Sequence, residues 1–179
     1  MASASENRRF AVVVLVVLAL DLAAKFAAEA LLPRWVGVSV IGEFFQLRLV
    51  YNPGAAFGLH VGPASRWVFM GLSAAALVIL GSMLRAAKPG DSLRVYSTAL
   101  VFAGAAGNLV DRIRSPRGVV DFLDFTFGTY HFPTFNVADS AVTCGAVLLA
   151  LSLWREDREA VRVPAAAPSV AAPTPPEAL

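Results

Sequence analysis

Four long apolar stretches dominate the pattern of hydrophobic and polar positions along the chain. They occupy residues 10–32, 67–84, 95–112 and 135–154. A helix needs about 20 residues to cross the hydrocarbon core of a bilayer. The pattern therefore predicts four membrane-spanning helices joined by polar connections.

The two longer connections between these stretches differ in character. Residues 33–65 contain β-branched and aromatic side chains that partly alternate with polar ones, at 36–41 and again at 44–51. Such alternation is typical of short strands, so we predict a small extramembrane β element on the membrane surface. Residues 113–134 are predicted to form a second surface segment, with no strand or helix assigned to it.

The composition favours an all-α integral membrane protein. Hydrophobic residues make up 57% of the chain and charged residues 16%, and the mean hydropathy is +0.64. Soluble domains carry about 25% charged residues. The net charge of +2 is too small to indicate a nucleic-acid partner. The single cysteine, Cys144, lies in an apolar run, so we expect a small buried hydrophobe and no intrachain disulfide.

The two ends of the chain bear on topology. Arg8 and Arg9 resemble the start of a cleaved signal peptide, but the length and internal charges of the following stretch favour a retained helix. Four spans place both termini on one side, and the basic flanks there predict that this side is cytoplasmic. From Val163 the chain is almost all Ala, Pro and Ser. We therefore predict a membrane domain over 1–162 and a disordered tail over 163–179.

Charged side chains interrupt the first apolar stretch. Asp21 and Lys25 are four positions apart, which places them on one helix face where they can pair. Charges at membrane depth face the protein interior and mark function or a structural ion pair. The sequence leaves open whether this pair locks the helix to its neighbours or takes a direct part in a site. Glu29, nearer the helix end, is predicted at the membrane interface.

Residues 118–140 carry three aspartates, Asp121, Asp124 and Asp139, in otherwise apolar surroundings. Asp139 falls at the start of the fourth predicted span, and the segment with Asp121 enters that span from the same face. Two carboxylates brought together at low dielectric cannot both ionise, so one keeps its proton. Such a pair can activate a water as general base and protonate a leaving amine as general acid. This is the chemistry of aspartic peptide hydrolysis.

Other interpretations of these residues stay open at this point. Asp124 competes with Asp121, because the spacing allows either to meet Asp139. In a purely structural alternative, Asp121 caps a turn and Asp139 pairs with an arginine. At the level of the whole protein, intramembrane charges also build proton relays. A small transporter or proton-coupled channel, and a non-catalytic membrane subunit, are therefore the alternative classes.

Metal and cofactor chemistry finds little support in the sequence. His60 and His131 are its only histidines, and no set of metal ligands can be assembled around them. His131 is expected to be an interfacial or hydrogen-bonded residue. The sequence contains no Gly-rich phosphate loop. We therefore expect neither a metal nor a cofactor.

Five sequence blocks, in order, resemble the bacterial lipoprotein signal peptidase family, also called signal peptidase II. The last two are the most specific, and the ordered set is far stronger than any single block. The tail from residue 163 lies outside the family pattern. The blocks are Asp21-x-x-x-Lys25, Asn52-x-Gly-Ala-Ala-Phe57, Gly107-Asn-Leu-Val-Asp-Arg112, Gly118-Val-Val-Asp-Phe122 and Phe135-Asn-Val-Ala-Asp-Ser140.

The resemblance implies a four-helix aspartic endopeptidase of the bacterial inner membrane. Its substrate would be a prolipoprotein whose cysteine already carries diacylglycerol, cut on the amino side of that cysteine near the outer membrane face. Block matching places the family's catalytic dyad on Asp121 and Asp139, not on Asp124. As partners we expect this substrate and membrane lipid, with the protein itself a monomer. Substrate-binding or dyad-supporting roles fall on Asn52, Gly54, Asn108, Arg112, Asn136, Asp21 and Lys25.

Overall fold

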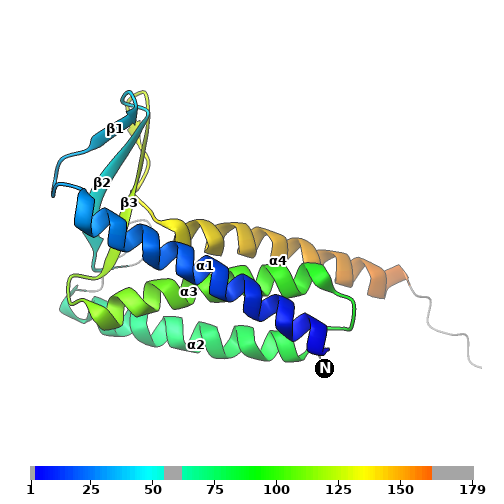
Figure 1. Ribbon diagram of the computed structural model, residues 1–179. Coiled ribbons are helices and arrows are strands. Elements are labelled where there is room, and N and C mark those ends of the chain that lie inside the picture. The colour runs from blue at the N-terminus through cyan, green and yellow to red at the C-terminus, as the bar shows by residue number, and fades with distance from the viewer. Residues whose placement is uncertain (1–2, 55–61, 163–179) are drawn as a thin grey trace, which may run out of the picture.

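The computed structural model describes residues 3–54 and 62–162, and in that part of the chain four long helices form a bundle (Figure 1). Each of the four is long and apolar enough to cross a membrane, which confirms the predicted spans. The first begins before the expected residue 10, because Ser3 and Glu6 form a reciprocal capping box at its polar start. The helices are α1 (Ala4–Leu31), α2 (Ser65–Arg85), α3 (Ser92–Arg114) and α4 (Val137–Arg162).

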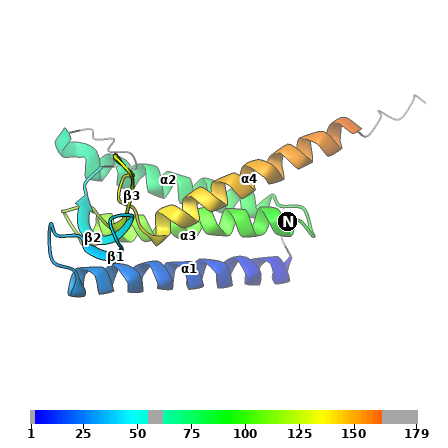
Figure 2. The ribbon, with the colours of Figure 1, turned by 90° about the horizontal axis from the view of Figure 1, so that it is seen from above.

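Helix α3 lies at the centre of the bundle and packs against the other three helices. Figure 2 shows it between α1 and α2, with α4 crossing over it. Close packing depends on small residues: a Cβ on Gly104 would collide with the Ala138 carbonyl, and one on Gly107 with the Asp21 carboxylate. Small residues let helices approach closely in lipid, where apolar burial gives little driving force.

The outer faces of the helices carry large apolar side chains. Leu15 is 66% exposed and Val78 is 73% exposed. Soluble proteins do not leave whole helix faces of this kind in water, so these faces are the surfaces that contact lipid. Cys144 is also exposed on α4, and the expectation that it would be buried was therefore wrong.

A four-stranded antiparallel sheet runs across one end of the bundle (Figure 1). The first two strands confirm the predicted β element. The second surface segment supplies the other two, for which no strand was predicted. The order is β1 (Val38–Ile41), β2 (Phe45–Asn52), β3 (Val119–Phe127) and β4 (Tyr130–His131).

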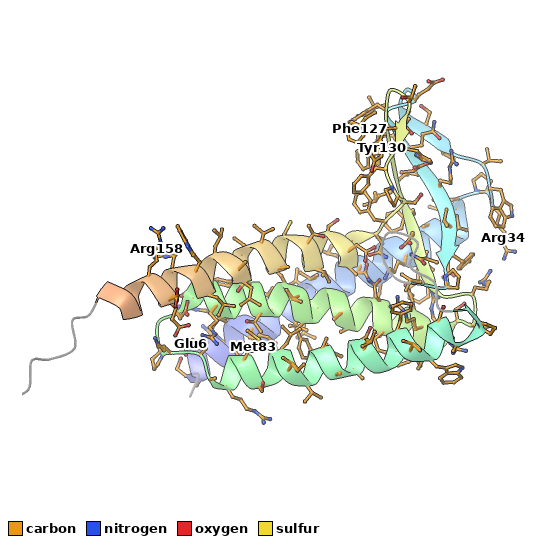
Figure 3. All side chains as sticks on the ribbon, turned by 180° about the vertical axis from the view of Figure 1, so that it is seen from behind. Glu6, Arg34, Met83, Phe127, Tyr130 and Arg158 are labelled. Atoms are coloured by element: carbon orange, nitrogen blue, oxygen red, sulfur yellow. The ribbon has the colours of Figure 1, made fainter. Side chains whose placement is uncertain are left out.

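The opposite end of the bundle carries both the start of α1 and the end of α4, as four spans require (Figures 1 and 3). Polar contacts tie this end together: Glu6 accepts a hydrogen bond from the Gly90 N–H at 2.6 Å, and Arg94 pairs with Glu156 at 2.8 Å. The predicted disordered tail over 163–179 and His60 lie outside the described residues.

Candidate active site

Asp121 lies in β3, opposite Val50 of β2, with 2% of its surface exposed. The strand can start here because Gly118, at φ 99°, passes so close to the Asn52 carbonyl that a side chain would collide with it. The two carboxylate oxygens of Asp121 accept hydrogen bonds from the Asn136 amide at 2.7 Å and the Asn52 amide at 3.1 Å.

Asp139 lies in the first turn of α4. Asn136 caps this helix, accepting a hydrogen bond from the Asp139 N–H at 2.8 Å, while Asp139 accepts one from the Asn136 N–H at 3.3 Å. The other oxygen of Asp139 accepts a hydrogen bond from the Asn108 amide of α3 at 2.8 Å. The capping motif and α3 together fix the direction of this carboxylate.

Amide side chains connect the two aspartates. The amide nitrogen of Asn136 lies 2.7 Å from Asp121 and 3.2 Å from the amide oxygen of Asn108, whose nitrogen in turn contacts Asp139. No salt bridge reaches either carboxylate within the described residues. The alternative in which Asp139 pairs with an arginine is therefore not seen there.

The environment of Asp121 changes its acidity. Burial raises the pKa of this carboxyl to about 7, and the nearby charge of Asp139 adds to the increase. The hydrogen bonds from Asn52 and Asn136 act in the opposite direction and lower the pKa, but they do not outweigh burial. Asp121 therefore titrates close to neutral pH, where it can exchange a proton during a reaction.

Both aspartates line one cavity of about 580 Å³. Its polar wall comes from the sheet, α3 and the start of α4, and its apolar wall continues between α2 and α4. The size is within the range of small-molecule and peptide sites. The polar lining residues are Asn52, Ser73, Asn108, Arg112, Asp121, Thr134, Asp139, Ser140 and Thr143, and the apolar ones include Phe69, Leu72, Val119, Phe132 and Val142.

Arg112 lines this cavity without pairing with an aspartate among the described residues. Its guanidinium donates to the Gly54 carbonyl at 2.8 Å and to the Asn108 carbonyl at 3.2 Å. The Gly54 N–H in turn donates to the Asn52 side chain at 3.0 Å. Four of the predicted supporting residues thus form one hydrogen-bonded wall beside the dyad. Ala55, Ala56 and Phe57 of the same sequence block lie outside the described residues.

Lys25 is the centre of a second polar cluster behind this wall. Its ammonium lies 2.8 Å from Asp21, 2.9 Å from Asp111 and 3.0 Å from the Asn108 amide oxygen. Asp21 also accepts a hydrogen bond from the Ala138 N–H at 2.8 Å. The predicted pair therefore joins α1 to α3 and α4. Neither Asp21 nor Lys25 lines the cavity, so they reach the dyad through Asn108.

The sequence interpretation missed the role of Asp111. This buried residue completes the Lys25 cluster and also accepts a hydrogen bond from the Val120 N–H at 3.2 Å, next to Asp121. It therefore holds β3 against α3. A sequence signal was available, because an acidic residue at the end of an apolar helix requires a partner.

Asp124 is kept apart from the cavity. It pairs with Arg48 at 2.9 Å and lies 3.3 Å from the His131 ring. His131 also lies 3.2 Å from the Thr126 hydroxyl, which confirms that it is a hydrogen-bonded residue. Of the two candidates for pairing with Asp139, the structure brings only Asp121 into the same cavity.

Comparison with known proteins decides the family. The model of the family described as signal peptidase (SPase) II matches residues 13–155. The chain belongs to the signal peptidase II family. Membership confirms a membrane peptidase and sets aside the transporter and the non-catalytic subunit as classes.

Curated relatives named lipoprotein signal peptidase match most of the chain. The protein of Desulforapulum autotrophicum is 43% identical over 144 residues, which is 78% of this chain and 88% of the relative. That of Geobacter sulfurreducens is 40% identical over 152 residues, 84% of this chain and 94% of the relative. That of Francisella tularensis subsp. novicida is 36% identical over 154 residues, with the same coverage.

Two solved structures, each described as a bacterial membrane enzyme studied by the in meso method, share the fold. One has a TM-score of 0.72 at 28% identity and covers 84% of this chain and 90% of its own. The other has a TM-score of 0.69 at 28% identity and covers 83% and 94%. The four-helix membrane architecture with its small sheet is thus confirmed.

Proposed function

We propose that the protein is an aspartic endopeptidase that removes the signal peptide from diacylglyceryl-modified prolipoproteins, cutting on the amino side of the lipidated cysteine. The family removes signal peptides from prolipoproteins. The observation that carries the proposal is that Asp121 and Asp139 line one cavity and are connected by amides, with no salt bridge to either carboxylate among residues 3–54 and 62–162.

The two carboxyl groups divide the acid and base roles. Asp121, whose pKa lies near 7, holds the proton, and Asp139 accepts a proton from water. The water oxygen adds to the scissile carbonyl carbon while Asp121 donates to the carbonyl oxygen. When the carbon–nitrogen bond breaks, the amine takes the proton that Asp139 received, and the returning carbonyl gives its proton back to Asp121.

The surrounding polar residues orient this pair. The amides of Asn108 and Asn136 fix both carboxylates, and Asn52 holds the second oxygen of Asp121. The guanidinium of Arg112 supplies positive charge in the same cavity, where it favours the negative charge that develops on the substrate carbonyl. Each group acts without moving, because each is already held by the backbone or by another side chain.

The cavity also fits the substrate class. A signal sequence is an apolar helix and the acyl chains of the modified cysteine stay in the leaflet, so both need apolar walls that continue into the bilayer. The sides formed by α2 and α4, with Leu72 and Val142, provide them. We also propose that the protein acts as a monomer.

The orientation in the membrane follows from charge. The dyad lies at the sheet end of the bundle, and the start of α1 and the end of α4, which carry Arg8, Arg9 and Arg155, lie at the other end (Figure 1). We place the termini in the cytoplasm by the positive-inside rule. The dyad then faces the outer side of the inner membrane, where lipid-modified precursors are exposed.

The test is cleavage of a diacylglyceryl-modified precursor by purified variants in proteoliposomes, followed by gel mobility. Asp121→Asn and Asp139→Asn should each lower the rate about 10²- to 10⁴-fold, because either change removes proton transfer. Asp124→Asn is the matched control and should keep most of the activity, since Asp124 pairs with Arg48 outside the cavity. Cleavage at the parent rate by Asp139→Asn protein would refute the dyad.

A further inference from the structure

A second cavity of about 310 Å³ lies where the end of α1 meets the sheet. Tyr51 lines this cavity, whereas its neighbour Asn52 lines the cavity with the dyad. Successive residues of a strand point to opposite faces, so β2 separates the two cavities. The lining residues are Arg34, Trp35, Leu49, Tyr51, Pro53 and Arg117.

Two arginines give this cavity a positive rim. Arg34 is exposed (Figure 3), and among the described residues no ion pair or side-chain hydrogen bond engages its guanidinium. The guanidinium of Arg117 lies 3.8 Å from the centre of the Tyr51 ring.

The nearest acidic group does not neutralise this rim. Glu29 lies 3.7 Å from Arg117 but only 2.7 Å from Arg114, and it also accepts a hydrogen bond from the Tyr51 hydroxyl at 3.0 Å. Its single negative charge is therefore divided between two arginines, and Arg34 adds a third. The region keeps a net positive charge.

Trp35 is a second unusual feature of this cavity, independent of the arginines. Its backbone adopts φ 68°, a left-handed conformation that bulky residues rarely take, and its side chain is 83% exposed. Strain of this kind persists where the surroundings or a ligand require it. Tryptophan is enriched at the level of lipid headgroups, and Trp35 follows the last turn of the α1 span closely.

We propose that this cavity binds the phosphodiester headgroup of an anionic membrane phospholipid, such as phosphatidylglycerol. The planar forks of Arg34 and Arg117 match phosphate oxygens, and Leu49, Pro53 and Trp35 accommodate the glycerol and the first acyl carbons. The diacylglyceryl substrate carries no phosphate, so this site differs from the substrate site in chemistry as well as in position. The inference requires only the membrane fold and does not rest on the proposed reaction.

The fluorescence of Trp35 can report binding of a ligand in this cavity. Phe in place of Trp67 and Trp154 leaves Trp35 as the sole tryptophan, because the chain has three. This parent protein is kept in maltoside micelles, which contain no phosphate. It is titrated with dihexanoyl phosphatidylglycerol, with dihexanoylglycerol, and with inorganic phosphate at constant ionic strength. A saturable change in Trp35 emission is expected with phosphatidylglycerol alone.

Charge removal tests the arginines. Each of Arg34→Gln and Arg117→Gln should raise the Kd for phosphatidylglycerol about fivefold, since one basic residue near an anionic lipid contributes about 1 kcal/mol. The matched control is Arg85→Gln with Arg155→Gln, two exposed arginines at the other end of the bundle, and it should keep the parent Kd. The stability of the Arg117→Gln protein is measured by thermal unfolding as well, because this change also removes the stacking of the Arg117 guanidinium on Tyr51.

Three results would overturn the proposal. An unchanged Kd in both the Arg34→Gln and the Arg117→Gln proteins would exclude the arginines as the phosphate ligands. Equal saturation by dihexanoylglycerol would show that the phosphate is not recognised. Equal saturation by inorganic phosphate would show an anion site that does not select a lipid.

Discussion

Two pairs of carboxylates lie on opposite sides of Asn108, and they are stabilised in different ways. Asp21 and Asp111 share the ammonium of Lys25, at 2.8 and 2.9 Å. Among the described residues, the side-chain partners of Asp121 and Asp139 are neutral amides, from Asn52, Asn136 and Asn108.

The difference separates a structural centre from a chemical one. The ammonium of Lys25 lies between the first two carboxylates, which also accept hydrogen bonds from the Ala138 and Val120 N–H groups and so hold α4 and β3 in place. Amides orient a carboxylate but cannot neutralise it, so the second pair is left with a proton to exchange. The first pair positions the second.

The largest expected effect on stability follows from removing the cation of the structural pair. Lys25→Met keeps a similar volume but leaves Asp21 and Asp111 buried without their ammonium. Breaking a buried pair in this way costs about 3–5 kcal/mol. Unfolding in detergent, measured as loss of helical circular dichroism, should show a clear decrease in the midpoint temperature.

Lys88→Met is the matched control for that change. Lys88 pairs with Glu156 at 2.7 Å, but its side chain is 70% exposed. Pairs of this kind contribute about 0–1 kcal/mol, so the midpoint should move little. Equal losses in the two variants would contradict a structural role specific to Lys25.

An effect of similar size is expected from pH, and it comes from the chemical pair. The pKa of Asp121 is raised to about 7 from an ordinary value of 3.8. Between these values the folded protein holds a proton that the unfolded chain has released. The contribution of Asp121 to the free energy of unfolding is therefore fully present below pH 4. It decreases by about 1.4 kcal/mol per pH unit as the pH rises toward 7.

Asp121→Asn tests this sign. The variant should lose the decrease in stability between pH 4 and pH 7 and should be more stable than the parent protein at pH 8. Asp157→Asn, which replaces an exposed carboxylate of α4, should keep the parent slope. If the Asp121→Asn protein were less stable than the parent protein at pH 8, the negative charge of Asp121 would be compensated in the folded parent, and the predicted sign would be wrong.

The smallest effect separates the two tasks of Asn136, which caps α4 and holds Asp121. Asn136→Ala should lose about 1 kcal/mol of stability with the cap, and most of the activity with the amide. Asn136→Ser keeps a capping oxygen but no amide, so it should recover stability and not activity. Recovery of both, in unfolding and cleavage assays, would show that the amide does not support the dyad.

Sequence reasoning predicted the features of the molecule that depend on local pattern. The spans follow from apolar length, and the Asp21–Lys25 pair from helical spacing. Strands β1 and β2 follow from alternation, as the residues around Phe45 show. The dyad needed the resemblance as well, because spacing did not distinguish Asp121 from Asp124.

What sequence reasoning missed depends on contacts between distant segments. β3 carries an apolar run with aspartates three positions apart, so it lacks regular alternation. Asp121 and Asp124 are three positions apart in β3 and so point to opposite faces of the strand, but only the pairing with β2 and the packing on α3 and α4 decide which face meets the cavity. The pairing of Asp111 with Lys25 likewise joins residues far apart in sequence, which no local pattern encodes.

The side chain of Asn108 has a consequence for proton movement between the two pairs of carboxylates. Its oxygen faces Lys25 and its nitrogen faces Asp139, and an amide does not titrate at any physiological pH. A carboxylate or histidine in its place would form a continuous relay from Asp139 to Asp21, inside the first helix. Asn108 interrupts that path and so keeps the proton that the dyad exchanges apart from the ion pairs of Lys25.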